Sequence, residues 1–354
     1  MNIHTPKHQK LSMIHGHGDD SYLYKHPIVA NFSTNVWYGG KSKQLKEHIF
    51  NIWDKIHSYP EVAAESLTLK IAENLGVTRK QVLATNGATE AFYLIAQCFR
   101  GKESTIVIPT FAEYEDACRI NKHQLNFIKW AELEENPPFP KGLAWICNPN
   151  NPDGSVLERD KLISFLTNNP ETLFVVDEAY IDFTDSISSS IDLINKFTNL
   201  ILVKSLTKNF AIPGLRLGYL VANKQLVQDI QFYKAPWSVN SIAIEAGKFI
   251  FDHFQDFKPP IKYYKSESEK FASKINDISG FRIIPSKTSY FLVKLEKGSS
   301  FELKKYLIDQ FGLLIRDASN FRGLNSSYIR LATQSEENNL LMIKALKEWS
   351  NLNS

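Results

Sequence analysis

Short apolar runs that alternate with stretches of helical periodicity constrain the fold of this chain more than any other feature. Fully apolar strands separated by helices are typical of a parallel or mostly parallel sheet that is covered on both faces. We therefore expect an α/β fold for the first part of the chain. The predicted strands are Gln81–Thr85, Ser104–Ile108, Leu143–Cys147, Leu173–Val176, Leu200–Lys204 and Leu217–Val221. The clearest predicted helices are Ala88–Phe99, Glu158–Thr167 and Ser241–His253.

The loops that follow these strands are the expected place for a ligand. In open α/β sheets, ligands bind beyond the carboxyl ends of the strands. Polar and turn-forming residues are concentrated at these positions in the chain. The loops are Asn86–Thr89, Pro109–Tyr114, Asn148–Gly154, Asp177–Tyr180 and Ser205–Lys208.

After about residue 255 the pattern changes to one typical of an α+β unit. The predicted helices there are Lys262–Ile275, Phe301–Gln310 and Glu336–Trp349, and the predicted strands are Arg282–Ile284, Tyr290–Lys294, Leu313–Arg316 and Tyr328–Ala332. A chain of 354 residues has room for two domains at roughly 150 residues each. We predict a large domain over residues 36–254 and a smaller α+β domain formed by residues 1–35 and 255–354.

Composition and charge exclude several classes of function. The formal net charge is only +3, and no basic run is interleaved with aromatic residues, so we expect no nucleic-acid partner. Cys98, Cys118 and Cys147 form no CxxC pair, which argues against a zinc site and a disulfide framework. No stretch reaches the roughly 18–20 apolar residues of a membrane span, and the first residues lack the apolar core of a secretion signal. The sequence therefore predicts a cytoplasmic protein with no metal and no membrane partner.

The strand-end loops together carry the groups that a phosphorylated pyridine aldehyde requires. Such a cofactor needs a lysine for the aldehyde, a carboxylate at the ring nitrogen and donors at the phenolate oxygen. It also needs a cradle of backbone N–H groups and hydroxyls for its phosphate. Each residue alone fits an ordinary structural role equally well, but the ordered set is far more specific. The candidates are Lys208, Asp177 at the ring nitrogen, Asn151 and Tyr180 at the phenolate, Tyr114 for ring stacking, and Gly87, Ala88, Thr89, Ser205, Thr207 and Arg216 at the phosphate.

The chain resembles the fold-type I enzymes of the class I/II aminotransferase group over nearly its whole length. The segments NPNNPDG (148–154), DEAY (177–180) and SLTKNFAIPGLRLGY (205–219) carry the resemblance. It implies pyridoxal 5′-phosphate (PLP) as cofactor, and a large domain with a mostly parallel seven-stranded sheet between helices. It also implies catalytic roles for Lys208, Asp177 and Tyr180. Tyr59 resembles a tyrosine that reaches the phosphate of the neighbouring subunit, which implies a homodimer with shared active sites.

Within this group the chain looks most like the branch of histidinol-phosphate aminotransferase and threonine-phosphate decarboxylase. The segments PTFAEYEDA (109–117) and IRDASNFRGLNSSYIRLATQSEENN (315–339) are similar to the decarboxylase side. The resemblance implies that Arg330 grips the substrate α-carboxylate and that His15, Arg316 and Arg322 are candidates for a substrate phosphate. Asn35 is a further candidate for substrate contact. The Asn-Pro that usually follows it in the family is replaced here by the bulkier Val36-Trp37-Tyr38.

Two reactions fit this set of residues. The first prediction is transamination between 2-oxoglutarate and a small, phosphorylated amino acid or amine such as histidinol phosphate. The alternative is decarboxylation of L-threonine O-phosphate. Which bond breaks depends on how Arg330 and the phosphate-binding groups orient the substrate. A non-catalytic binding protein is disfavoured by the intact Lys208 and Asp177, and a nicotinamide-dependent dehydrogenase by the lack of G-x-G-x-x-G after an early strand.

Overall fold

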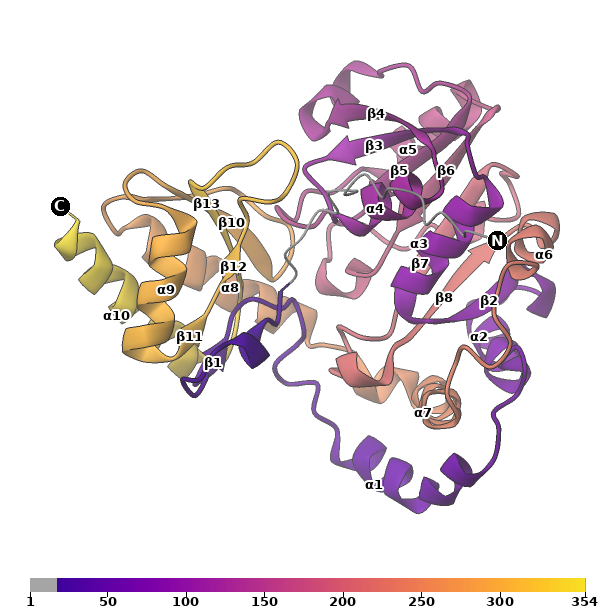
Figure 1. The fold of residues 1–354 in the computed structure, drawn as a ribbon, viewed down its shortest axis with the longest axis horizontal. Coiled ribbons are helices and arrows are strands. Elements are labelled where there is room, and N and C mark those ends of the chain that lie inside the picture. The colour runs from indigo at the N-terminus through magenta and orange to yellow at the C-terminus, as the bar shows by residue number, and fades with distance from the viewer. Residues whose placement is uncertain (1–17, 354) are drawn as a thin grey trace, which may run out of the picture.

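The computed structural model describes residues 18–353 and contains a larger α/β unit beside a smaller α+β unit (Figure 1). The larger unit is built on one sheet. Its strands are β2 (Val82–Asn86), β3 (Glu103–Ile108), β4 (Gln124–Lys129), β5 (Gly142–Cys147), β6 (Thr172–Asp177), β7 (Leu200–Ser205) and β8 (Leu217–Ala222). They lie in the order β2-β8-β7-β6-β5-β3-β4. The paired strands run parallel except at β8, which is antiparallel to both β2 and β7.

Helices cover both faces of this sheet. They are α1 (Lys43–Asn51), α2 (Glu65–Leu75), α3 (Gly87–Cys98), α4 (Glu113–Ile120), α5 (Arg159–Asn168), α6 (Lys224–Gln231) and α7 (Ser241–Asp252). Side chains alternate across a strand, so Leu200 and Leu202 of β7 enter the core under α2, α5 and α7. Ile201 and Val203 enter the core under α3, α4 and α6. The apolar runs of the sequence are apolar throughout because both faces of these strands are buried.

The smaller unit packs three helices against short antiparallel strands. The helices are α8 (Ile261–Asn276), α9 (Ser300–Phe311) and α10 (Glu336–Leu352), and the sheet has the order β12 (Arg316–Asp317), β13 (Tyr328–Ala332), β10 (Tyr290–Leu295) and β9 (Phe281–Ile283). The N-terminal strand β1 (Ala30–Asn31) joins it by pairing in parallel with β11 (Leu313–Leu314). A separate core, which includes Phe32, Phe291 and Leu331, holds this unit together.

The predicted α/β class and the seven-stranded, mostly parallel sheet are confirmed. Two details differ from the prediction. Strand β4 and helix α4 were not predicted, and the single strand predicted over Leu313–Arg316 is two strands that pair with different partners. Ile315 separates β11 from β12 there, because the chain leaves its pairing with β1 and turns into the four-stranded sheet.

The topology brings the functional loops to one edge of the large sheet. Strands β5, β6 and β7 are parallel, so the loops that follow them meet at the same edge. Because β8 runs in the opposite direction, Arg216, the residue before it, arrives at that edge as well. Within residues 18–353, no helix is long and apolar enough to span a membrane.

Candidate active site

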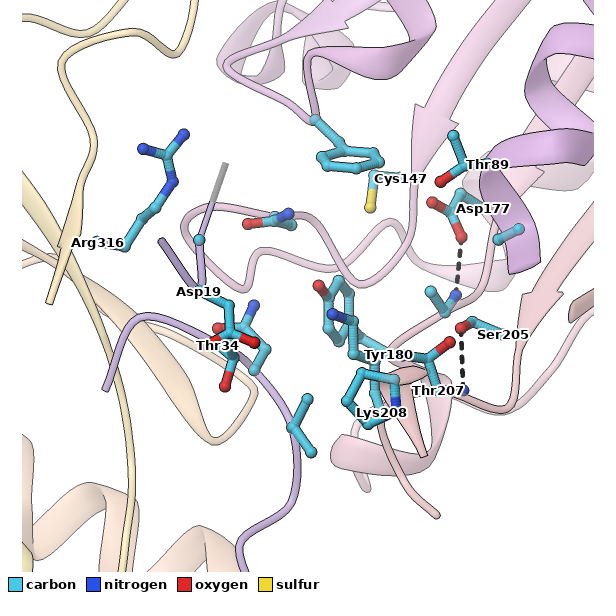
Figure 2. Close-up of a pocket in the computed structure, with 18 of the residues that line it drawn as sticks. Asp19, Thr34, Thr89, Cys147, Asp177, Tyr180, Ser205, Thr207, Lys208 and Arg316 are labelled. Atoms are coloured by element: carbon cyan, nitrogen blue, oxygen red, sulfur yellow. Dashed lines mark hydrogen bonds between the residues drawn. The ribbon is translucent and has the colours of Figure 1, made fainter. Parts of the chain in front are cut away.

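A cavity of about 470 Å³ lies at this edge, between the large sheet and the smaller unit (Figure 2). The larger unit contributes its strand-end loops to the lining, and the smaller unit contributes the 316–321 region and Arg330. From the predicted set, the lining includes Asn35, Ala88, Thr89, Asn151, Asp177, Tyr180, Ser205, Thr207, Lys208, Arg216, Arg316 and Arg330. Segments far apart in the sequence therefore form one site.

Lys208 lies three residues after the end of β7, with its side chain in the cavity. Its backbone carbonyl accepts a hydrogen bond from the Trp37 amide at 3.0 Å, which ties the lysine loop to the N-terminal segment. Burial, helped by the positive charges of Arg330 and Arg216, lowers the pKa of the Lys208 amine to about 8. At this pKa roughly a tenth of the amine is neutral at pH 7, far more than for an ordinary lysine, and the neutral form is the one that a nucleophile or a base requires.

Asp177 is the last residue of β6 and is fully enclosed below the cavity. Its Oδ2 accepts a hydrogen bond from the Tyr114 hydroxyl at 2.5 Å, and its Oδ1 accepts one from the Ala179 amide at 2.9 Å. Burial raises the pKa of the carboxyl to about 6, although these two donors oppose the rise. A positively charged group of a ligand would relieve this cost, because it would supply the counter-ion that the buried carboxylate needs.

Tyr114 does not lie where ring stacking would require it, which corrects the prediction for this residue. Helix α4 begins at Glu113, so Tyr114 turns into the core, where its ring stacks on Trp145 at a centroid distance of 5.7 Å. The aromatic side chain that lines the cavity from this segment is Phe111, three residues earlier. The hydroxyl of Tyr114 instead supports Asp177 from beneath.

The start of helix α3 forms a cradle suited to a phosphate. Gly87 has a left-handed φ of 74°, and a Cβ placed there would come within 2.6 Å of the Arg216 guanidinium. Only glycine leaves this space and adopts this conformation without strain. Ala88 and Thr89 open the helix beside it, and an anion is favoured at a helix N-terminus. With the hydroxyl residues Ser205 and Thr207 also in the lining, these residues fit the phosphate of PLP.

Asn151 and Tyr180 line the cavity between Asp177 and the smaller unit. The Asn151 Oδ1 accepts a hydrogen bond from Arg330, so the amide nitrogen is the atom left to donate to a ligand. Burial raises the pKa of the Tyr180 hydroxyl, which therefore stays protonated and remains a donor. Both side chains can thus stabilise a negatively charged oxygen.

The smaller unit presents two buried arginines to the cavity. Arg330 on β13 donates to the Asn151 side chain and to the Ser33 carbonyl, and its buried Nε has no hydrogen-bond partner among the described residues. Arg316 on β12 donates to the Asn320 Oδ1 at 2.7 Å. Burial, together with the nearby charge of Arg330, lowers the pKa of the Arg316 guanidinium to about 10. Two positive charges held this close favour an anionic ligand.

Asn35 also lies in this part of the cavity. Both polar atoms of its side chain are buried, and within residues 18–353 neither is in a hydrogen bond of good geometry, although Tyr180 lies beside it. A buried amide without hydrogen bonds lowers the stability of the folded state. A ligand that supplied the missing bonds would remove this cost. The position of Asn35 therefore fits the substrate contact that was predicted for it.

Besides Gly87 and Tyr114, two predicted residues in the described part of the chain, Arg322 and Tyr59, do not line the cavity. Arg322 instead pairs with Glu115 of helix α4, because that buried carboxylate requires positively charged partners. The Tyr59 side chain is 87% exposed and packs against Trp237 on a different part of the surface. His15 lies outside the described residues.

The cavity also contains residues that the sequence did not single out, among them Asp19, Thr34, Phe111 and Asn320. Asp19 has a left-handed φ of 65°, and its amide donates to the Ser33 Oγ at 2.9 Å. The only signal in the sequence for Asp19 was its place directly after the His-Gly-His-Gly segment at positions 15–18. For Phe111 the signal was an aromatic residue two positions after Pro109, nearer to the strand end than Tyr114.

The chain belongs to the class I and II aminotransferase family. The family model "Aminotransferase class I and II" matches residues 27–346, which is most of the chain. This family depends on PLP. The fold and the site described above therefore fall within a family of PLP-dependent enzymes.

Similar proteins of known name represent two reactions. The crystal structure of L-threonine-O-3-phosphate decarboxylase from Porphyromonas gingivalis is 42% identical, with a TM-score of 0.88, over 90% of this chain and 99% of that chain. Histidinol-phosphate aminotransferase from Caldanaerobacter subterraneus subsp. tengcongensis is 31% identical, over 86% of this chain and 89% of that protein. Histidinol-phosphate aminotransferase from Sinorhizobium meliloti, whose structure was solved in complex with PLP, shares the fold at 19% identity, with a TM-score of 0.79 over 92% of each chain.

Proposed function

We propose that this chain binds PLP in the cavity and acts on a small phosphorylated amino acid or amine. When bound, PLP supplies an electron sink for the bond that breaks at the substrate α-carbon. Lys208 holds the aldehyde, Asp177 supports the charge at the ring nitrogen, and Asn151 and Tyr180 donate to the phenolate oxygen. The phosphate is held by the start of α3, by Ser205 and Thr207, and by Arg216. Phe111, in place of Tyr114, covers one face of the ring.

The protein groups that move a proton and orient the substrate follow from the same geometry. With substrate bound, the Lys208 amine would take or return a proton at the substrate α-carbon. Its pKa of about 8 suits both directions near neutral pH. Arg330 holds the substrate carboxylate, while Arg316 and Asn35 complete the substrate side. The smaller unit covers one side of the cavity, which limits the access of water to the reacting bond.

Decarboxylation of L-threonine O-phosphate is the reaction best supported. The observation that carries this choice is the 42% identity to L-threonine-O-3-phosphate decarboxylase over 90% of the chain. The charges of the cavity support it, because Arg316 and Arg330 offer two cationic positions for a substrate with both a carboxylate and a phosphate. In this reaction the bond to the carboxylate breaks, carbon dioxide leaves, and a proton takes its place on the α-carbon.

Transamination of histidinol phosphate is the second candidate. It is supported by the 31% identity to a histidinol-phosphate aminotransferase over 86% of the chain. In this reaction the Cα–H bond breaks, and Lys208 moves the proton. Histidinol phosphate has no carboxylate, so Arg330 would bind the carboxylate of the 2-oxo acid partner.

The two reactions are separated by their products. The purified protein with PLP is incubated with L-threonine O-phosphate, and separately with histidinol phosphate plus 2-oxoglutarate. Carbon dioxide and aminopropanol phosphate from the first mixture would establish the decarboxylase, and glutamate from the second would establish the aminotransferase. Turnover in neither mixture would overturn the proposed substrate class.

We also infer a homodimer in which Tyr59 serves the site of the second copy. The Tyr59 ring is exposed and lies outside its own cavity, beside the half-exposed Trp237. Phe232 is 84% exposed on the same loop region as Trp237. Apolar side chains gathered in this way on a surface are typical of a protein interface.

A further inference from the structure

Glu115 of helix α4 is a carboxylate shared by two arginines. Arg322 donates from Nε to Oε2 at 2.7 Å and from NH2 to Oε1 at 2.6 Å. Arg119, one helical turn along α4, donates to Oε1 at 2.8 and 2.6 Å. The Glu115 side chain is only 5% exposed. Burial opposes its ionisation, but the two guanidinium groups outweigh burial and hold the pKa of the carboxyl below its ordinary value.

The two arginines differ in what they connect. Arg119 and Glu115 belong to the same helix, so their pair does not connect α4 to any other part of the molecule. Arg322 belongs to the smaller unit, and its pair with Glu115 fastens that unit to the larger one. Its guanidinium also lies 4.2 Å from the centre of the Phe127 ring on β4, a second contact with the larger unit.

Arg322 is part of a segment, residues 316–324, that forms a wall of the cavity. Arg316, Asn320 and Phe321 of this segment line the cavity. The segment is anchored to the smaller unit by Phe321, which packs with Leu292 and Ala318. Arg322 anchors its other side to α4, the helix that follows Phe111. The Arg322–Glu115 pair therefore lies behind the walls formed by the 316–324 segment and by Phe111, and does not enter the cavity.

We propose that Arg322 is a positioning residue, which acts through the 316–324 segment to fix the substrate-binding wall against helix α4. This inference rests on the proposed function, because it assigns the wall to the substrate. Bidentate pairing of arginine with a carboxylate fixes the angle as well as the distance, so it holds a segment more rigidly than a single point charge. A shift of about 1 Å in a positioning group can cost roughly a hundredfold in rate.

Two variants of the PLP-loaded enzyme separate the two arginines. Arg322→Met removes the guanidinium and keeps an unbranched apolar side chain over Phe127. Arg119→Met is the matched control, since it removes a partner of the same carboxylate. The two arginine side chains are also equally exposed, at 39% and 40%. Arg322→Lys keeps the charge and loses the bidentate geometry, so it tests the geometry itself.

The first readout is amide hydrogen exchange across residues 316–324, which requires no substrate. We expect exchange to be roughly tenfold faster in Arg322→Met and unchanged in Arg119→Met. Equal exchange in the two variants would overturn the anchoring, whatever the substrate proves to be. Arg322→Lys should give an intermediate rate, and wild-type exchange in that variant would overturn the bidentate geometry as the cause.

The second readout is the split between KM and kcat. For Arg322→Met we expect the KM for L-threonine O-phosphate to rise by roughly ten- to a hundredfold, with a smaller change in kcat. The affinity for PLP should be unchanged, because Lys208, Asp177 and Arg216 hold the cofactor from other loops. Faster exchange with a wild-type KM would overturn the positioning role. If the wild-type enzyme turned over neither proposed substrate, the proposed function would fail, and the exchange result would still decide the anchoring.

Discussion

At the scale of single residues, the hydrogen bond from Tyr114 to Asp177 should control cofactor affinity. Tyr114→Phe leaves one oxygen of a buried carboxylate without a donor, which favours its neutral form and weakens its hold on a positively charged ring nitrogen. Hydrogen bonds to charged groups contribute about 1.5–3 kcal/mol, so we expect PLP to bind at least roughly tenfold more weakly. A fluorescence titration of the cofactor-free protein measures this.

Tyr264→Phe is the matched control for that variant. Tyr264 is also buried, and its hydroxyl donates to the Thr333 carbonyl at 2.9 Å, away from Asp177. Both variants should lower the free energy of unfolding, but only Tyr114→Phe should lower PLP affinity. Equal PLP affinity in the two variants would show that the support of Asp177 by Tyr114 is unimportant for the cofactor.

The lowered pKa of Lys208 predicts how cofactor attachment depends on pH. Only the neutral amine attacks an aldehyde, and a pKa of about 8 makes that form dominant above pH 8. The rate of attachment should therefore rise up to about pH 8 and then level off. Stopped-flow absorbance of the bound cofactor measures the rate, and Lys208→Ala should abolish both that absorbance and turnover. A rate that still climbs towards the ordinary lysine pKa of 10.5 would contradict the assignment.

Most of the residues predicted to hold the cofactor line the cavity, because they follow apolar strands directly. Lys208, Asp177 and Asn151 could be placed in this way, since parallel strands end at one edge. Tyr114 and Arg322 could not. The position of Tyr114 depends on where α4 begins, and that of Arg322 on a carboxylate more than 200 residues earlier in the chain, with which it pairs. Neither fact is encoded in the local pattern around the residue.

At the scale of elements, the turn from β2 into α3 should be intolerant of a side chain. Gly87→Ala places a Cβ within 2.6 Å of the Arg216 guanidinium and forces alanine into a left-handed conformation. We expect the free energy of unfolding to fall by about 1–2 kcal/mol. PLP affinity should fall as well, because Arg216 is displaced. Chemical denaturation and PLP titration measure the two effects.

Gly76→Ala supplies the control for this turn. Gly76 ends helix α2 with a φ of 68°, and a Cβ placed there would meet nothing within 4 Å. The backbone strain is therefore similar, without the contact. This variant should lose comparable stability and keep its PLP affinity. Loss of affinity in both variants would trace the effect to general destabilisation.

The strands that could be predicted from the sequence were those with an uninterrupted run of apolar residues. Strands buried on both faces are mainly apolar, as β7 is from Leu200 to Val203, and were found within a residue or two. Strand β4 lies at the edge of the sheet and keeps polar residues such as Gln124 and Asn126, so it lacks this signature. The divided strand at Ile315 reflects a change of pairing partner, which no local pattern records.

At the scale of the whole molecule, the inferred dimer predicts that two inactive variants complement each other. Lys208→Ala disables its own site, and Tyr59→Ala should disable the site of the second copy. In a mixed dimer one site would contain both changes and the other neither. After the variants are unfolded and refolded together, we expect activity well above that of either one. No recovery from mixtures that contain verified mixed dimers would place Tyr59 outside the partner's site.

The pairing of β1 with β11 has a consequence for synthesis on the ribosome. Ala30 leaves the ribosome long before its partner, Leu313, has been made. The sheet formed by β2 to β8 is complete well before then, and domains tend to fold as units as they emerge. The groups that hold the cofactor, from Gly87 to Arg216, can thus assemble before Arg316 and Arg330 exist. Cofactor capture can therefore begin on the growing chain, whereas substrate recognition waits until the smaller unit has been made.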